Sequence, residues 1–244
     1  MNRVFFCLVL AMNYTFSQAA RADVTAAELL EKYDKIMGPT QFESEMEMTS
    51  NREDGTSRTY SMKALKSGDD KFRIWFTSPS AVSGQEILRI GDNSWLYLPN
   101  LKRASRLANR DSFQGGDFNN SDILRVNYTK DFDGKIITSE EPSSYKLELK
   151  SKNKDTSYDL IHLWIAKSNF MPLKGEYFGT SGKKLRSAEF SDVKEFSKSY
   201  TRPAKVLMKN EIVPARSSIL MIKKIKTDIS PAPQKFLQTD LGKG

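Results

Sequence analysis

Most of the chain alternates between apolar and polar residues with a period of two, and short turn signals interrupt the alternation. In the segment that begins at Phe42, the apolar residues Phe42, Met46 and Met48 alternate with glutamates. A period of two places successive side chains on opposite faces of a β-strand. Strands joined by short turns pair with antiparallel neighbours. The pattern therefore predicts an antiparallel meander.

The expected strands form two runs. The first extends from Phe42 to Leu98 and contains a hairpin around Gly91-Asp92-Asn93, and the second extends from Lys135 to Thr227. Together they make roughly ten or more strands in one sheet, a size at which open twisted sheets begin to curl. A strongly curved sheet has a concave face that other elements must cover.

Two helical segments are expected to supply part of that cover. Thr25 and Glu28 have the spacing of a capping box, the apolar residues of 29–37 recur at helical spacing, and Gly38-Pro39 ends the run. Residues 122–128 are expected to form one or two further helical turns. Two short helices are too few to fill a large concavity, so the sequence predicts a partly unfilled apolar trough.

The segment from Ser112 to Asp122 separates the two runs of strands. It sets Phe113 and Phe118 among glycines and asparagines. Glycine lowers the cost of rearranging a backbone, so we interpret this segment as a mobile flap over the trough.

The first 22 residues have the features of an export signal. Arg3 gives a charged start, Val4–Met12 is an apolar run too short to span a bilayer, and Ala20–Ala22 is a small-x-small cleavage site. We expect residues 1–22 to be removed and residues 23–244 to form one periplasmic domain. The alternative is an uncleaved anchor or an ordinary buried helix. Cleavage would remove Cys7, which is the single cysteine.

The net charge of the whole chain is +8, and loss of Arg3 and Arg21 with the signal would leave +6. This excess is spread along the strands, which favours solubility and is compatible with contact to anionic lipid head groups. The short basic run from Lys223 to Lys226 is interrupted by Ile225, as in a solvated edge strand. We therefore expect no nucleic-acid partner.

No catalytic motif stands out in the sequence. The only histidine, His162, falls in mid-strand without a neighbouring cysteine, so we interpret it as structural. The chain has no phosphate-binding glycine loop, dinucleotide fingerprint or Gly-x-Ser-x-Gly elbow. Spacing leaves open a triad assembled by folding, but no pattern favours one. We expect a protein without enzymatic activity, cofactor or metal.

Several motifs taken in order resemble the outer-membrane lipoprotein-sorting proteins, the LolA/LolB-like group, and in particular its uncharacterised branch. The motifs are Trp95–Pro99, the segment Phe113–Phe118 with Asp122 after it, Met171–Lys174 and Glu189–Val193. The resemblance implies a half-barrel of about eleven antiparallel strands, with an N-terminal helix and a short helical flap covering an apolar cavity. It also implies that the cavity shields acyl chains and that no catalytic residue is needed. The cargo stays open between lipoprotein, free lipid and glycolipid.

The first functional hypothesis is thus a monomeric periplasmic carrier of lipid or lipoprotein acyl chains, which exchanges cargo with an inner-membrane transporter and an outer-membrane acceptor. Two alternatives remain: a sensor or interaction module that recognises a membrane protein or lipoprotein without transporting lipid, and a fully packed scaffold. An error of one residue in assigning a strand turns all its side chains to the opposite face, so the sequence does not fix which face lines the trough. The ligand-binding candidates are therefore apolar residues of several strands, together with the two phenylalanines of the flap. These candidates are Met46, Met48, Trp75, Leu96, Leu98, Phe113, Phe118 and Trp164.

Overall fold

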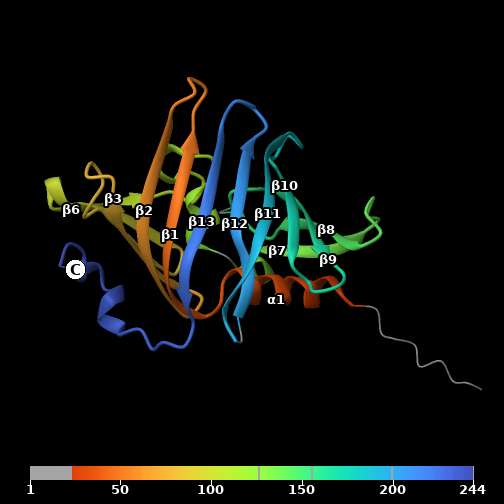
Figure 1. The fold of residues 1–244 in the computed structure, drawn as a ribbon, viewed down its shortest axis with the longest axis horizontal. Helices are drawn as coiled ribbons and strands as arrows, with labels where there is room; N and C mark the ends of the chain where they lie inside the picture. The colour runs from red at the N-terminus through yellow and green to blue at the C-terminus, as the bar shows by residue number, and fades with distance from the viewer. Residues whose placement is uncertain (1–23, 126, 155, 199, 244) are drawn as a thin grey trace, which may run out of the picture.

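The computed structural model describes residues 24–125, 127–154, 156–198 and 200–243. Residues 1–22, the expected signal, lie outside this part of the chain. The described residues form one antiparallel sheet of 13 strands in the order β6-β5-β4-β3-β2-β1-β13-β12-β11-β10-β9-β8-β7 (Figure 1). The strands are β1 (Gln41–Asn51), β2 (Ser57–Ser67), β3 (Lys71–Ser78), β4 (Glu86–Ile90), β5 (Asn93–Leu98), β6 (Arg103–Leu107), β7 (Phe132–Ile137), β8 (Ser144–Ser151), β9 (Leu160–Ala166), β10 (Pro172–Phe178), β11 (Lys184–Ser197), β12 (Tyr200–Asn210) and β13 (Ser217–Lys226).

The chain enters this sheet in the middle. From β1 it meanders outward to the edge strand β6, crosses to the opposite edge at β7, and meanders back until β13 pairs with β1. The connection between the two edges, residues 108–131, must span the whole sheet. We call it the crossover segment, and it contains the short helices α2 (Asn120–Leu124) and α3 (Tyr128–Asp131).

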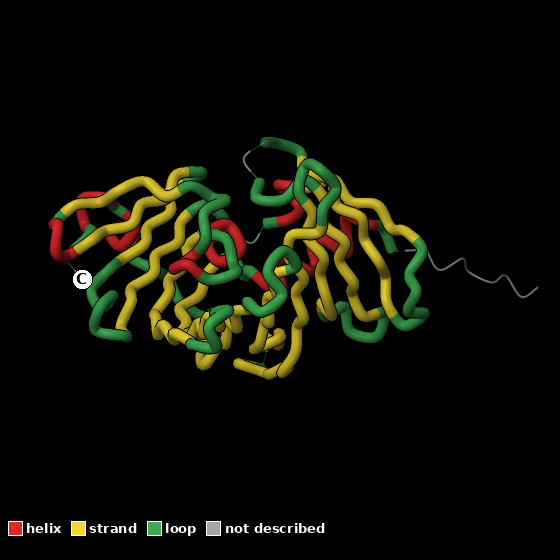
Figure 2. Tube along the Cα trace, turned by 90° about the horizontal axis from the view of Figure 1, so that it is seen from above, coloured by secondary structure: helices red, strands yellow, loops and turns green. Residues whose placement is uncertain are grey.

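The sheet is bent into a trough, and the N-terminal helix and the short helices of the crossover segment lie inside it (Figure 2). The N-terminal helix α1 (Ala26–Met37) contacts α3, β7 and β12. The crossover segment and α1 together cover the concave face. The sequence-based prediction of a curved antiparallel sheet covered by an N-terminal helix and a short helical segment is confirmed, with 13 strands in the described residues where about eleven were expected.

The helix α1 forms as its sequence predicts. The Thr25 hydroxyl accepts a bond from the Glu28 backbone N–H at 3.2 Å, and the Glu28 carboxylate accepts one from the Thr25 backbone N–H at 2.8 Å. These two bonds satisfy amide donors that a helix start leaves unpaired. Its apolar face, which includes Leu29, Leu30 and Tyr33, is buried against the sheet.

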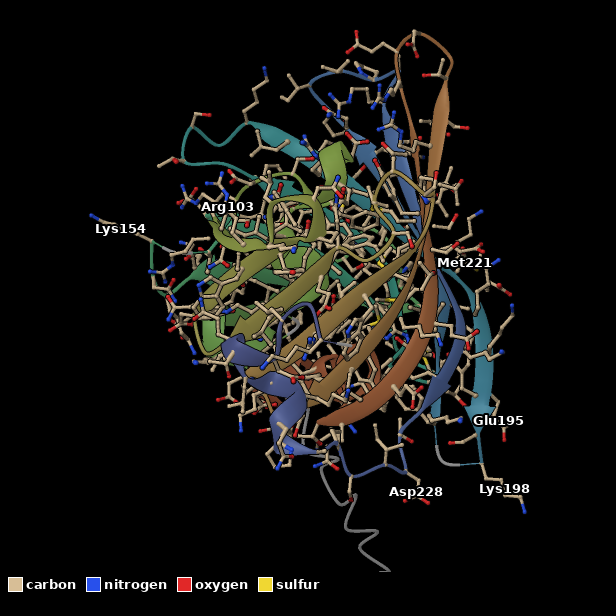
Figure 3. The ribbon with its side chains drawn as sticks, turned by 90° about the vertical axis from the view of Figure 1, so that its left-hand side faces the viewer. Arg103, Lys154, Glu195, Lys198, Met221 and Asp228 are labelled. Carbon is tan, nitrogen blue, oxygen red and sulfur yellow. The ribbon has the colours of Figure 1, made fainter. Side chains whose placement is uncertain are left out.

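The alternation within each strand separates the two faces of the sheet. In β13, Leu220 and Ile222 are buried on the concave side, whereas Met221 lies on the outer side of the curve (Figure 3). The concave side holds the main core, to which Met48, Met62 and other residues of alternating strands contribute. The pairing of β1 with β13 makes this core continuous across both halves of the chain.

A C-terminal segment covers part of the convex face. It contains two short turns of 3-10 helix, η3 (Pro233–Phe236) and η4 (Gln238–Asp240), and its Phe236 and Leu241 pack with Leu88 in a second apolar cluster. Arg73 is fully buried beneath it, with an ion pair to Glu86 and a second to the Asp240 carboxylate at 3.0 Å.

The strand β6 is one reason for the higher strand count. We expected the first run of strands to end at Leu98, before this strand. Most of this edge strand is exposed, so it lacks the apolar alternation that marks strands with one buried face. Within the described residues, no helix is long and apolar enough to cross a membrane.

Candidate functional site

A pocket of about 80 Å³ lies between the concave face of the sheet and its cover. Its floor is formed by concave-face residues of the central strands, including Phe42, Met46, Val206, Leu220 and Ile222. The cover contributes residues of α1, α2 and α3, together with Phe118. The lining is therefore assembled from both meanders and from the segments that cross between them.

Aromatic residues form one wall of this pocket. The rings of Tyr33 in α1 and Tyr128 in α3 lie 4.8 Å apart, and Tyr177 of β10 lies beside Tyr128. Burial raises the pKa of all three hydroxyls, so the tyrosines are neutral hydrogen-bonding groups in an apolar setting.

Asp122 is an acidic group of the same lining. Its carboxylate accepts bonds from the Asn119 backbone N–H at 2.8 Å and the Tyr158 hydroxyl at 2.9 Å. Burial raises the pKa of Asp122 to about 6, and these bonds oppose the increase. The expected helical turns in this region are present, with Asn119 as the N-cap of α2.

The end of the pocket beside the C-terminus of α1 is polar. Lys66 of β2 donates from Nζ to the Gly38 carbonyl at 2.7 Å, and Arg202 of β12 donates from a terminal nitrogen to the Met37 carbonyl at 2.9 Å. Both side chains are buried, at 5% exposure each, and both line the pocket with Ser44. Lys66 and Arg202 bind the carbonyls of adjacent residues, so they converge on one end of the site.

At the opposite end of the covered interior, Asp117 anchors the crossover segment. This fully buried carboxylate accepts bonds from Asn210 Nδ2 at 2.9 Å and Ser218 Oγ at 3.0 Å, and Arg216 Nε lies 3.6 Å from it. The Asp117 backbone N–H donates to Ser218 Oγ at 2.9 Å. Hydrogen bonds therefore hold the crossover segment against β12 and β13.

The packing differs from the mobile flap expected from the glycines. Phe113 is fully buried and Phe118 is 2% exposed. A Cβ on Gly116 would lie 3.0 Å from Ser218 Oγ and 3.3 Å from Met48 Cε, so glycine here permits close packing. Phe113 and Phe118 enter the core because the crossover segment must run along the concave face.

The eight candidate residues lie in different places. Met46 and Phe118 line the pocket. Met48 and Phe113 are buried in the main core without lining it, and Leu96 packs at its margin. Leu98 is half-buried at the end of β5, away from the pocket lining.

Two tryptophans lie on the convex face and must be corrected as lining candidates. Trp75 lies under Arg73, on the side of the C-terminal segment, at 4.9 Å from ring centroid to guanidinium. Trp164 is packed between Lys146 and Lys174, each 4.6 Å from its ring centroid. Each tryptophan directly follows a concave-facing residue of its strand, Ile74 in β3 and Leu163 in β9, so its side chain points to the convex face. The apolar character of tryptophan does not reveal which face it occupies.

The sequence interpretation missed Lys66, Arg202, Tyr33 and Asp122 as lining residues. A signal for Lys66 existed, since it continues the concave-facing series of Met62 and Ala64 at intervals of two. A cation at an apolar position of a strand is a sign of a polar group held in the interior.

No group of three or more metal-ligating side chains occurs in the part of the chain that the structure describes. His162 lies between two glutamates, with Nε2 3.6 Å from Glu148 and Nδ1 3.9 Å from Glu176. The described residues of the pocket therefore offer apolar surface, hydroxyls and buried charges.

Comparisons with known proteins give a consistent group of relatives. A family model described as "-like: Uncharacterized protein" matches residues 68–243. No curated protein matches the chain. Among solved structures, a LolA superfamily protein from Nitrosomonas europaea is similar with a TM-score of 0.81 and 27% identity, over 90% of this chain and all of that one.

Two further structures share the fold at lower identity. A putative outer membrane lipoprotein-sorting protein domain from Vibrio parahaemolyticus has a TM-score of 0.77 and 22% identity, over 89% of this chain and 98% of its own. A DUF1329 family protein from Desulfovibrio piger has a TM-score of 0.78 and 20% identity, over 88% of this chain and 97% of its own.

Proposed function

Because the chain belongs to the LolA/LolB-like group of outer-membrane lipoprotein-sorting proteins, in a branch whose family model is described as an uncharacterized protein, we propose that it carries acyl chains of a lipid or lipoprotein between membranes. The observation that carries this proposal is the largely apolar lining of the pocket between the concave face and its cover. Burying a methylene group contributes about 0.8 kcal/mol, so an acyl chain gains strongly from such a lining when it leaves water.

The pocket is smaller than the roughly 300–1,000 Å³ of typical small-molecule sites, at about 80 Å³. Acyl-chain entry therefore requires the cover to move. The helices α1 and α3 are tied together, because the Asp34 carboxylate accepts bonds from the Tyr128 and Thr129 backbone N–H groups at 2.8 and 2.9 Å. In the proposed cycle this pair shifts as a unit while Asp117 holds the crossover segment in place at the other end of the interior.

The proposal takes residues 23–244 as one carrier domain that acts in the periplasm after loss of residues 1–22. Its donor and acceptor are membrane components, an inner-membrane transporter and an outer-membrane acceptor. An acyl chain that is carried by burial in a pocket forms no covalent bond with the protein, so the proposed cycle uses no catalytic residue.

The test is to purify the protein from its periplasmic location, extract bound lipid under native conditions, and measure uptake of a fluorescent acyl lipid. Val206→Phe should fill the pocket floor and lower acyl-lipid affinity about tenfold or more, since Val206 is a concave-face lining residue. Leu207→Phe is the matched control, because Leu207 is the next residue of β12 and lies on the opposite face.

Equal lipid binding by the two variants would contradict the pocket as the acyl site. Absence of bound lipid together with failure to take up the fluorescent lipid would overturn the carrier function. A stable complex with a membrane protein in that case would support the sensor alternative.

A further inference from the structure

Three polar side chains of the pocket lining, Lys66, Arg202 and Ser44, share one chemical property. Lys66, Arg202 and Ser44 can all donate hydrogen bonds, and all three are at most 5% exposed. Buried charges in proteins are normally paired with an opposite charge. The hydrogen-bond partners of these three groups therefore bear on what the pocket is built to hold.

Lys66 projects from β2 into the concave side. Its ammonium group has three N–H donors, and the bond to the Gly38 carbonyl at 2.7 Å uses one of them. Among the described residues, no carboxylate lies within ion-pair distance of Lys66. Capping the C-terminus of α1 accounts for one donor and leaves the charge without a direct counter-ion.

Arg202 projects from β12 toward the same helix end. Its Nε donates to the Pro203 carbonyl at 3.1 Å and one terminal nitrogen donates to the Met37 carbonyl at 2.9 Å. The described part of the chain gives this guanidinium no carboxylate partner either. Since β1 and β13 lie between β2 and β12, the two cations approach the end of α1 from opposite sides of the pocket.

Ser44 lies on β1 between these two strands. Its hydroxyl is buried, it lines the pocket, and it finds no hydrogen-bond partner among the described residues. A buried hydroxyl without a partner costs about 1–3 kcal/mol, so its place in one lining with two buried cations needs a reason. An acceptor bound in the pocket would give it one.

The acidic neighbours do not supply that acceptor. Asp122 lines the same pocket, and its carboxylate is occupied by the Asn119 backbone N–H and the Tyr158 hydroxyl. Asp34 is the closest in chain position to the end of α1, and its carboxylate is occupied by the Tyr128 and Thr129 backbone N–H groups and the Thr129 hydroxyl. Asp69 is exposed. Gly38 also borders a surface depression formed with Thr40 and Asn127, so the polar end of the pocket is near solvent.

From this arrangement we propose that the pocket selects an acyl lipid with an anionic head group, a carboxylate or phosphate, which is bound by Lys66, Arg202 and Ser44 at the end of α1. The inference rests on the proposed carrier function and specifies its cargo class. The apolar lining takes the chain, and the three donors take the charged end. An anion at this position receives charge-assisted hydrogen bonds, which are stronger than neutral ones.

The test compares two probes that share one chain and differ in head-group charge. Binding of dodecanoate and dodecanol to the mature protein is measured by calorimetry near neutral pH, with inorganic phosphate as a third probe. The wild-type protein should bind dodecanoate about tenfold or more tightly than dodecanol, the ratio expected for hydrogen bonds to a charged group. Inorganic phosphate should bind much more weakly than dodecanoate.

Two variants and one control test whether the preference for dodecanoate over dodecanol depends on Lys66 and Ser44. Lys66→Met should lower dodecanoate affinity about tenfold and bring the ratio of dodecanoate to dodecanol affinity close to one. Ser44→Ala, which removes only an unpartnered hydroxyl, should lower dodecanoate affinity a few-fold without affecting folding. The control is Lys63→Met, which removes the same charge from an exposed, convex-facing position of the same strand.

The outcomes separate this inference from the carrier function. Equal affinity for dodecanoate and dodecanol, or equal effects of Lys66→Met and Lys63→Met, would overturn the head-group site while leaving acyl binding intact. Tight binding of inorganic phosphate that Lys66→Met abolishes would overturn the lipid assignment in favour of a free-anion site. Binding of neither amphiphile would overturn the carrier function itself.

Discussion

The two ends of the covered interior are built differently. At the anchored end, Asp117 accepts bonds from Asn210 and Ser218 and lies near Arg216, so a buried charge is matched by donors of the chain itself. At the pocket end, Lys66 and Arg202 are buried and bound to carbonyls, with Tyr200 as a further neighbour of Arg202, and neither has a carboxylate partner in the described residues. The first arrangement holds a segment in place, and the second leaves donors available. Asp117 thus fixes the crossover segment at one end of the interior, and our proposal places ligand recognition at the other end.

The strongest test of the anchored end is Asp117→Ala. This change removes the acceptor for Asn210 and Ser218 and leaves them buried, so we expect a loss of about 3–5 kcal/mol in the free energy of unfolding. Urea unfolding of the two proteins measures it.

Asp111→Ala is the control for Asp117→Ala. Asp111 belongs to the same crossover segment and is exposed, so its removal should change stability by less than about 0.5 kcal/mol. Similar losses in both variants would mean that Asp117 does not anchor the segment.

The pocket end should respond to pH in a way that the anchored end does not. Burial lowers the pKa of Lys66 from 10.5 to about 8. The unfolded state therefore binds more protons than the folded state between these values, and stability rises with pH in that window. Relative to Lys66→Met, the wild-type protein should gain on the order of 2–3 kcal/mol between about pH 7 and about pH 11.

Urea unfolding at both pH values tests this difference, with Lys63→Met as the control for general effects of charge. Parallel pH profiles of wild type and Lys66→Met would show that burial of Lys66 carries no such cost. A fall in wild-type stability across the window, relative to the variant, would contradict the sign of the shift.

The smallest expected effect comes from a matched pair of serines. Ser218→Ala at the anchored end removes both bonds to Asp117 and should cost about 1–3 kcal/mol. Ser44→Ala at the pocket end removes a hydroxyl with no partner among the described residues and should be neutral or slightly stabilising. Thermal or urea unfolding compares them, and equal costs would remove the distinction between the two ends.

Local features of the fold followed from the sequence because they depend on neighbouring residues. The capping box of Thr25 and Glu28 starts α1 as predicted, and the hairpin at Gly91 joins β4 to β5. The alternation that begins at Phe42 correctly separates the buried Phe42, Met46 and Met48 from the glutamates between them. Each of these depends on contacts or periodicity within about a dozen residues.

Features that depend on distant contacts did not follow. The sequence indicated two meanders but gave no sign that β13 pairs with β1. This pairing joins the two meanders into one trough. The sequence therefore gave no sign that residues 108–131 must cross the concave face, and the glycines there were interpreted as mobility when Gly116 serves close packing. The positions of Trp75 and Trp164 on the convex face were likewise undetermined.

The sequence by itself determined that this chain is a curved antiparallel sheet with an N-terminal helix, because hydrophobic period and capping are local properties. Only the tertiary structure decided which residues face the pocket, that Asp117 fixes the crossover segment at one end of the interior, and that Lys66 and Arg202 converge on the end of α1. Lys66 and Arg202 are 136 positions apart in the sequence. They meet because β1 and β13 pair in the middle of the sheet, a contact between the two ends of the fold that no local pattern encodes.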